Sequence, residues 1–199
     1  LPTSKDEIIF IGNSITDSGE WTALFRDEKV KNMGISGDIS AGVIHRIGDV
    51  AKRKPNKIFL HIGTNDLARG ISTDSLINNI LLIATYIKNQ SRSTKLFVLS
   101  ILPVSDYYHK FAGHTKNNEK IISVNNALQK NATEFSYTFI DIHSSFKDKN
   151  GNLKTDLSND GLHPMGAAYH IWKHIIYPYV YDVQLRPSLI PMPKEIVWK

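Results

Sequence analysis

The chain contains no cysteine. This excludes disulfide bonds and thiolate metal sites, and cysteine usage therefore says nothing about the redox compartment. Every apolar run is far shorter than the roughly 20 residues that a membrane-spanning helix needs, so we expect no membrane span. Internal repeats and low-complexity segments are also absent, which leaves no sign of a repeat array or a long linker.

Dense basic clusters are scarce, although the net charge is +5. The densest basic run covers residues 52–57 and has no interleaved aromatic residues. Such a run is typical of a solvated helix end and turn rather than of a nucleic-acid surface. We therefore expect no nucleic-acid partner.

The length and composition indicate one domain. With 199 residues, of which 41% are hydrophobic and 22% charged, the chain can build a full core. We expect a single domain over residues 1–199, with the proline-bearing stretch 178–199 as an extended tail on its surface. The chain begins at Leu1 with no apolar signal region, which is compatible with a trimmed form of a secreted or periplasmic protein. The sequence leaves the compartment and the oligomeric state open.

Strand-like and helix-like segments alternate along the chain. Five apolar segments predict strands, at residues 8–11, 30–33, 57–62, 95–102 and 137–142. Apolar residues at helical spacing predict four helices: one after Ser40, one after Thr73, one over residues 121–128, and one from Pro164 to Tyr177. Thr73 is the expected N-cap of the second helix, and Pro164 is the expected first residue of the fourth. This alternation predicts an α/β fold, with a parallel sheet and helices on both of its faces.

The first predicted strand stops abruptly at Gly12-Asn13-Ser14. In open α/β folds, ligands bind outside the carboxyl ends of the strands, so Ser14 is a candidate nucleophile. Asn13, Ser14 and Thr16 are also common helix caps and turn formers. On this segment alone, the capping interpretation is favoured.

Three predicted strands end in small polar turns, which contain Ser14, Gly37 and Asn65, and a later loop carries Asp160 and His163. The turns after parallel strands converge on one edge of the sheet. Acyl transfer needs a nucleophile, a base, a group that orients the base, and donors for the oxyanion. These segments together contain side chains and backbone groups for each part.

Four segments together resemble the sequence blocks of a known family. Residues 12–16, 34–38, 63–66 and 160–164 are similar, in the same order, to the four blocks of the SGNH (GDSL-type) esterase and acetylhydrolase family. Within it, the chain looks most like the platelet-activating-factor acetylhydrolase-like bacterial members. One position departs from the pattern, since the family usually has Asp where this chain has Asn13. Asn forms similar turn and cap hydrogen bonds, so catalysis is not put in doubt.

The resemblance implies a fold and a role for each matching residue. The family fold is a three-layer α/β/α sandwich with a flavodoxin-like, five-stranded parallel sheet. Ser14 would be the nucleophile, His163 the general base and then acid, and Asp160 the residue that holds the imidazole. The oxyanion hole would consist of the backbone N–H groups of Ser14 and Gly37 and the side-chain amide of Asn65. No cofactor is required.

The implied substrate is a small-molecule or glycan ester. Polar turns around the proposed site favour a short acyl group, most plausibly acetyl on a carbohydrate, and we expect substrate contacts from Asp38, Asp66, Tyr107 and Tyr108. The two tyrosines lie in the loop 103–117, whose length is typical of a functional loop. Two alternatives stay open: a lysophospholipase or thioesterase acting on longer acyl chains, and a non-catalytic glycan-binding module that keeps the fold.

The remaining histidines do not indicate a metal centre. His61 lies inside an apolar strand and is expected to be structural. His170 and His174 are one helical turn apart, a spacing that can bind metal. No carboxylate-rich segment accompanies them, so we expect no metal site.

Overall fold

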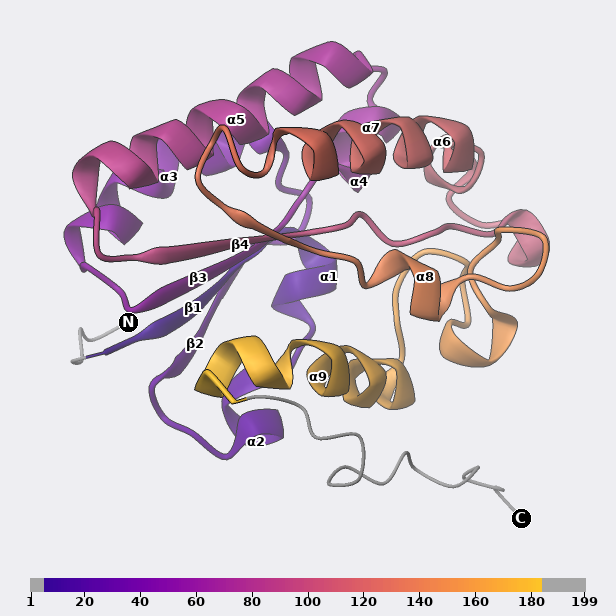
Figure 1. Ribbon diagram of the computed structural model, residues 1–199. Helices are drawn as coiled ribbons and strands as arrows, with labels where there is room; N and C mark the ends of the chain where they lie inside the picture. Colours follow the sequence, from indigo (N-terminus) through magenta and orange to yellow (C-terminus); the bar gives the residue numbers. More distant parts are fainter. Residues whose placement is uncertain (1–5, 184–199) are drawn as a thin grey trace.

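A five-stranded parallel sheet forms the centre of the computed structural model, which describes residues 6–183 (Figure 1). The strand order is β2-β1-β3-β4-β5, and each neighbouring pair is parallel. The strands are β1 (Ile8–Gly12), β2 (Val30–Gly34), β3 (Lys57–His61), β4 (Lys95–Leu99) and β5 (Thr138–Ile140). The predicted fold class is confirmed.

Strand β1 lies in the middle of the core because its side chains are apolar on both faces. All five of its residues are buried, as the lack of polar alternation predicts. Phe10 stacks between Trp21 and Phe59, with ring centroids 4.3 and 5.0 Å away. The nucleophile candidate therefore follows a rigidly packed strand.

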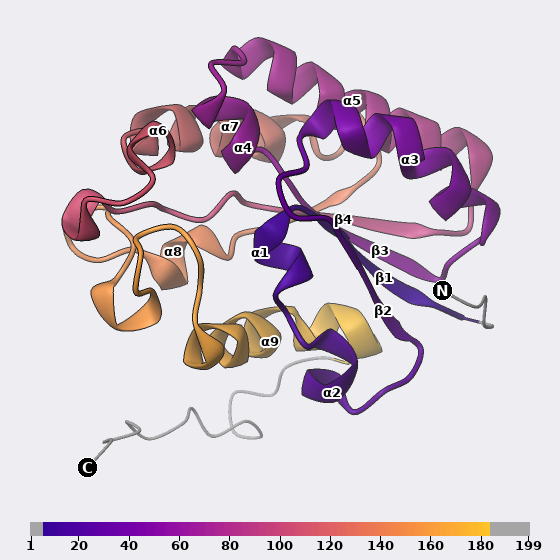
Figure 2. The same cartoon turned by 180° about the vertical axis from the view of Figure 1, so that it is seen from behind.

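Helices cover the sheet in two layers (Figures 1 and 2). One layer contains α3 (Ser40–Lys52), α5 (Thr73–Gln90) and α7 (Asn118–Asn131). The other contains α2 (Trp21–Phe25), α8 (His143–Phe146) and α9 (Gly166–Tyr181). Three short helices complete the fold around the carboxyl ends of the strands: α1 (Ser14–Asp17), α4 (Thr64–Ala68) and α6 (Ala112–Thr115). Two 3-10 turns, η1 (Asp106–Tyr108) and η2 (Thr155–Leu157), lie in the loops.

Several predicted boundaries are wrong by a few residues. Strands β4 and β5 end at Leu99 and Ile140, so both are shorter than their apolar runs. The N-cap of α5 is Ser72, whose Oγ accepts a hydrogen bond from the backbone N–H of Ser75, and not Thr73. Helix α9 begins at Gly166 rather than at Pro164, because Pro164 pairs with Ser158 in an antiparallel bridge.

The predicted tail is also wrong where the structure describes it. Pro178 lies inside α9, which continues to Tyr181, while residues 184–199 lie outside the described range. The buried Nζ of Lys57 donates hydrogen bonds to the carbonyl oxygens of Tyr179 and Val180, at 2.8 and 2.7 Å. Lys57 thereby satisfies backbone carbonyls in the last turn of α9. This contact comes from β3, so the prolines of the C-terminal sequence could not predict that the helix continues.

Between residues 6 and 183, no helix combines the length and the apolar character needed to cross a membrane.

Candidate active site

Ser14 is the first residue of α1, directly after β1. Asn13 is the N-cap of this helix, and its Oδ1 accepts a hydrogen bond from the backbone N–H of Ile15 at 3.0 Å. Gly12 permits a close approach, since a Cβ there would lie 2.2 Å from both the His61 carbonyl oxygen and Thr16 Oγ1. Capping and presentation of a nucleophile are therefore compatible: Asn13 caps the helix, and Ser14 is left at the strand end.

Three of the predicted site residues lie in one hydrogen-bonded line. Ser14 Oγ is 3.1 Å from His163 Nε2, and His163 Nδ1 is 2.7 Å from Asp160 Oδ2. The side chains of His163 and Asp160 are 30% and 15% exposed, so the line is accessible at its serine and histidine end and covered at its carboxylate end. A base that contacts a hydroxyl on one side and a carboxylate on the other can remove a proton from that hydroxyl.

The Asp160 carboxylate is held ionised by its own loop. Its Oδ1 accepts hydrogen bonds from the backbone N–H groups of Leu162 and His163, both at 2.8 Å, and from Ser158 Oγ at 3.1 Å. Burial by itself would raise the pKa of Asp160, but the hydrogen bonds from His163 and Leu162, together with the charge of His163, lower it below its ordinary value. Asp160 is therefore an anion when it orients the imidazole of His163.

Gly161 explains how this loop fits against its neighbour. Its φ of +81° favours glycine, and a Cβ there would lie 1.9 Å from the Ser105 carbonyl oxygen. The backbone N–H of Ser105 donates to the Gly161 carbonyl at 2.9 Å. The segment after β4 therefore braces the loop that carries Asp160 and His163.

The turn after β2 brings Gly37 to the same edge of the sheet. Gly37 has φ of +80°, and the N–H of Asp38 closes the turn on the Ile35 carbonyl at 3.0 Å. Arg46, on α3, contacts the Asp38 carboxylate at 2.9 Å and donates to the carbonyl oxygens of Met33 and Gly12 at 2.7 and 3.1 Å. It thus joins the ends of β1 and β2 to the turn. Nothing in the local sequence pattern distinguishes this arginine from other helix-surface arginines.

Asn65 enters the site from α4, directly after the β3 end. Its side chain is almost fully buried and makes two polar contacts. Nδ2 donates to the Asp38 backbone carbonyl at 2.8 Å, and Oδ1 is 3.0 Å from His114 Nε2. The structure therefore brings Asn65 to the turn that carries Gly37. It also places His114, from the loop 103–117, in contact with Asn65.

Asp66 and Asp38, both expected to contact substrate, are hydrogen-bonded to neighbouring scaffold residues. Asp66 has no exposed surface, and its carboxylate accepts hydrogen bonds from the Ser40 backbone N–H at 3.0 Å and the Ser40 hydroxyl at 2.5 Å. Burial raises the pKa of Asp66, an effect that these bonds and the charge of Arg69 oppose. The carboxylate of Asp38 is engaged by Arg46. The buried position of Asp66 contradicts its assignment to substrate contact.

Besides His114, the loop 103–117 carries three large aromatic residues, which differ in their surroundings. Tyr107 is 68% exposed, and Tyr108 donates its hydroxyl to the Thr155 carbonyl at 2.8 Å. The ring of Phe111 lies 5.3 Å from that of His163 and 5.9 Å from that of His114, edge to face in both cases. Phe111 therefore packs beside His163, and no local sequence signal distinguishes it from Tyr107 and Tyr108.

His61 is a structural histidine, as predicted. It is 1% exposed, packs edge to face on Trp172 at 4.9 Å, and burial lowers its pKa to about 3. Among the described residues, no group of three or more His, Cys, Asp or Glu side chains could hold a metal ion.

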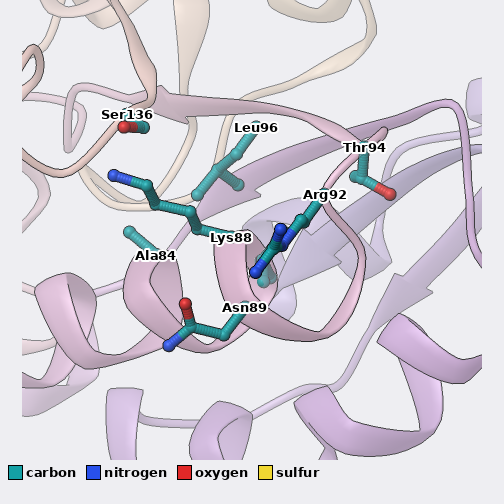
Figure 3. Close-up of a pocket in the computed structure, with 8 residues that line it drawn as sticks. Ala84, Lys88, Asn89, Arg92, Thr94, Leu96 and Ser136 are labelled. Carbon is teal, nitrogen blue, oxygen red and sulfur yellow. The ribbon is translucent and has the colours of Figure 1, made fainter.

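A separate pocket of about 420 Å³ lies at the other end of the sheet (Figure 3). It is formed by the end of α5, the start of β4 and the segment before β5, and it is lined by Ala84, Ile87, Lys88, Asn89, Arg92, Thr94, Leu96 and Ser136. These elements are at the amino ends of the strands, whereas Ser14 follows a carboxyl end. The pocket is therefore not part of the candidate active site.

Fold and site together define the class of protein. The hydrogen-bonded line of a serine, a histidine and a carboxylate at the carboxyl edge of a parallel sheet has the geometry that hydrolases with an activated serine use. The model of the GDSL-like lipase/acylhydrolase family matches residues 10–171. The chain belongs to this family, and it is an ester hydrolase. The resemblance noted in the sequence is confirmed.

The similar proteins include enzymes with different names. The chain is 27% identical to N-acylneuraminate cytidylyltransferase of Escherichia coli over 176 residues, which cover 87% of the chain and 40% of that protein. The chain thus spans well under half the length of this relative. It is 24% identical over 172 residues to rat platelet-activating factor acetylhydrolase IB subunit alpha2, covering 83% of the chain and 72% of the relative.

A solved structure shows the same fold. A GDSL-like lipase from Bacteroides thetaiotaomicron superimposes with a TM-score of 0.80, at 24% sequence identity and with 92% of each chain covered.

Proposed function

We propose that this chain is a serine esterase that removes short acyl groups, above all acetyl, from a hydroxylated alcohol such as a carbohydrate. The observation that carries the proposal is the line from Ser14 Oγ through His163 to Asp160. The name of the rat relative, an acetylhydrolase, supports an acetyl group as the one removed.

The mechanism follows from this line. His163 Nε2 takes the proton of the Ser14 hydroxyl as Oγ attacks the ester carbonyl, and Asp160 stabilises the imidazolium that forms. The tetrahedral intermediate then expels the alcohol, which receives the proton from His163, and leaves an acyl group on Ser14. Water attacks this ester by the same route, with His163 as base and then as acid, and releases the carboxylic acid.

Three donors are available for the oxyanion. Ser14 is the first residue of α1, so its N–H has no carbonyl one turn earlier to bind. The backbone N–H of Gly37 and the Asn65 amide come from the two neighbouring strand ends. The amide nitrogen of Asn65 has two hydrogens and uses one on the Asp38 carbonyl, so the other is left for the substrate.

The exposed surroundings support a small acyl group on a polar alcohol. In the turns that follow β1, β2 and β3, the polar residues Asp17, Ser36 and Arg69 are exposed. Phe111, beside His163, offers one ring face or edge on which a sugar could pack. A long acyl chain would instead need a continuous apolar wall, since each CH₂ contributes about 0.8 kcal/mol only where it is buried.

The nucleophile is tested by Ser14→Ala. We expect ester hydrolysis and labelling by a fluorophosphonate probe to disappear while the unfolding temperature stays unchanged, because Ser14 carries no core packing. Ser18→Ala, the same change on an exposed residue of the same segment, is the matched control. Hydrolysis or labelling retained in Ser14→Ala would remove Ser14 from the mechanism, and a wild-type chain that neither hydrolyses nor labels would support the glycan-binding alternative.

Acyl specificity is tested with acetyl, butyryl, octanoyl and palmitoyl esters of one leaving group. We expect kcat/KM to be highest for acetyl and to fall beyond butyryl. The same assay should include O-acetylated sugars and O-acetylated N-acylneuraminates, given the name of the Escherichia coli relative. A steady rise beyond butyryl would contradict the short-acyl proposal in favour of a lysophospholipase or thioesterase.

A further inference from the structure

The amide of Asn65 is held from both sides, and the two contacts together fix its orientation. A backbone carbonyl only accepts hydrogen bonds, so the atom of Asn65 that lies 2.8 Å from the Asp38 carbonyl must be the nitrogen. The amide oxygen then faces His114 Nε2 at 3.0 Å. Because that oxygen only accepts, His114 Nε2 must carry a hydrogen. The tautomer of His114 therefore follows from the geometry.

We propose that His114 is a positioning residue for the oxyanion hole, which acts by orienting the Asn65 amide. This inference rests on the proposed function. With His114 holding the oxygen and Asp38 holding one N–H, the second N–H of Asn65 has a single direction left. A rotated or flipped amide would present its oxygen, or no donor, to the developing negative charge.

The loop that carries His114 is built to hold this position. His109 and Phe111 both have φ near +50°, although neither is a glycine, and such residues persist only where the surroundings determine them. The backbone N–H of His114 donates to the Phe111 carbonyl at 2.7 Å. On the other side, Asn117 Nδ2 donates to the carbonyl oxygens of Gly113 and His114 at 2.7 and 3.2 Å. The backbone on both sides of His114 is therefore anchored.

The charge state of His114 fits the same role. Burial, and after it the positive charges of His163 and Arg69, lower the pKa of His114. A neutral imidazole with its hydrogen on Nε2 can still donate to Asn65. It also adds no positive charge beside His163 at the step in which His163 becomes an imidazolium. Because Nε2 carries the hydrogen and donates it to the Asn65 oxygen, this nitrogen cannot itself accept a proton.

The first experiment separates the hydrogen bond from side-chain volume. His114→Leu removes the donor, whereas His114→Gln places an amide nitrogen at the same number of bonds from Cα as Nε2. In the leucine variant we expect kcat to fall about 10- to 100-fold, with KM changed less than about twofold. This loss in kcat is smaller than the roughly 10²–10³ that follows removal of a whole oxyanion donor, because the Asn65 amide is still present. The glutamine variant should recover most of kcat. His170→Leu, on an exposed histidine of α9, is the matched control.

A double-mutant cycle decides whether His114 acts through Asn65. Asn65→Ala alone should lower kcat by about 10²–10³ with little change in KM. Adding His114→Leu to that variant should lower kcat no further, because the amide that His114 orients is gone. A wild-type kcat in His114→Leu would overturn the inference. So would an equal loss in the wild-type and Asn65→Ala backgrounds, which would mean a structural or direct role.

A measurement on the wild-type chain does not depend on any variant folding. Nitrogen NMR of the imidazole should show His114 with its hydrogen on Nε2 at neutral pH. A hydrogen on Nδ1 alone would overturn the inference. Failure of the proposed function looks different, because it would appear as activity in Ser14→Ala or as inactivity of the wild-type chain, and the tautomer would still be readable.

Discussion

Replacing Asp160 by asparagine should reverse the hydrogen bond that orients His163. In the native loop, Oδ1 accepts from two backbone N–H groups, those of Leu162 and His163, while Oδ2 accepts from His163 Nδ1. An asparagine must keep its oxygen towards the two backbone donors, so its NH₂ group faces His163 Nδ1. That nitrogen must then accept, which moves the imidazole hydrogen to Nε2. In this tautomer His163 cannot take the proton of Ser14.

The size of the effect follows from the same contacts. To restore the working tautomer, the asparagine would have to flip and leave the two backbone N–H groups facing an NH₂ group. Each unsatisfied buried donor costs about 1–3 kcal/mol, so the flip costs roughly 2–6 kcal/mol. At about 1.4 kcal/mol per factor of ten, kcat should fall between about 30-fold and about 10⁴-fold. The upper end matches the loss of about 10⁴ that the corresponding change causes in a serine protease triad.

The assay is steady-state hydrolysis of a p-nitrophenyl acetate series, with the unfolding temperature measured in parallel. Asp156→Asn, an exposed carboxylate on the same loop, is the matched control and should leave kcat unchanged. Because asparagine is close in size and shape to aspartate, Asp160→Asn should fold normally. A folded Asp160→Asn variant within about threefold of the wild-type kcat would refute the tautomer reasoning.

Three further predictions concern stability. His61 has a folded pKa of about 3 against an unfolded value near 6.5, so its contribution to the free energy of unfolding is complete above pH 6.5 and is lost as the pH falls. Between pH 7 and pH 5, the free energy of unfolding measured in urea should fall by about 2 kcal/mol for this reason. His61→Leu should flatten this pH dependence. Gly12→Ala should lower the free energy of unfolding by about 2 kcal/mol or more, because the added Cβ would collide with Thr16. Gly166→Ala is the control, since its Cβ would meet open space, and it should leave the unfolding temperature unchanged. Lys57→Met should cost about 2 kcal/mol or more, since it leaves two carbonyls of α9 unsatisfied; an unchanged urea midpoint would show that water replaces them.

The sequence by itself determined the strands and the candidate triad. A buried parallel strand reads as an uninterrupted apolar run, so β1 and β3 are visible without any tertiary information. The segments around Ser14 and Asn65 directly follow such apolar runs, and Asp160 lies in a short loop. The order of these segments along the chain matches the order of the family's sequence blocks. Asp160 and His163 are three residues apart, so their contact is local and could be anticipated.

The tertiary structure decided everything that depends on partners far apart in the chain. His114 and Asn65 are separated by 49 residues, and neither has a local signal that points to the other. Arg46 similarly binds Gly12, 34 residues earlier, and looks like any helix-surface arginine until the fold places it there. Polarity suggested that Asp66 lines the site, but burial against Ser40 removes it from the surface. Local pattern reports which face of an element is apolar, whereas only packing determines which polar groups meet, and so which of them can act on a substrate.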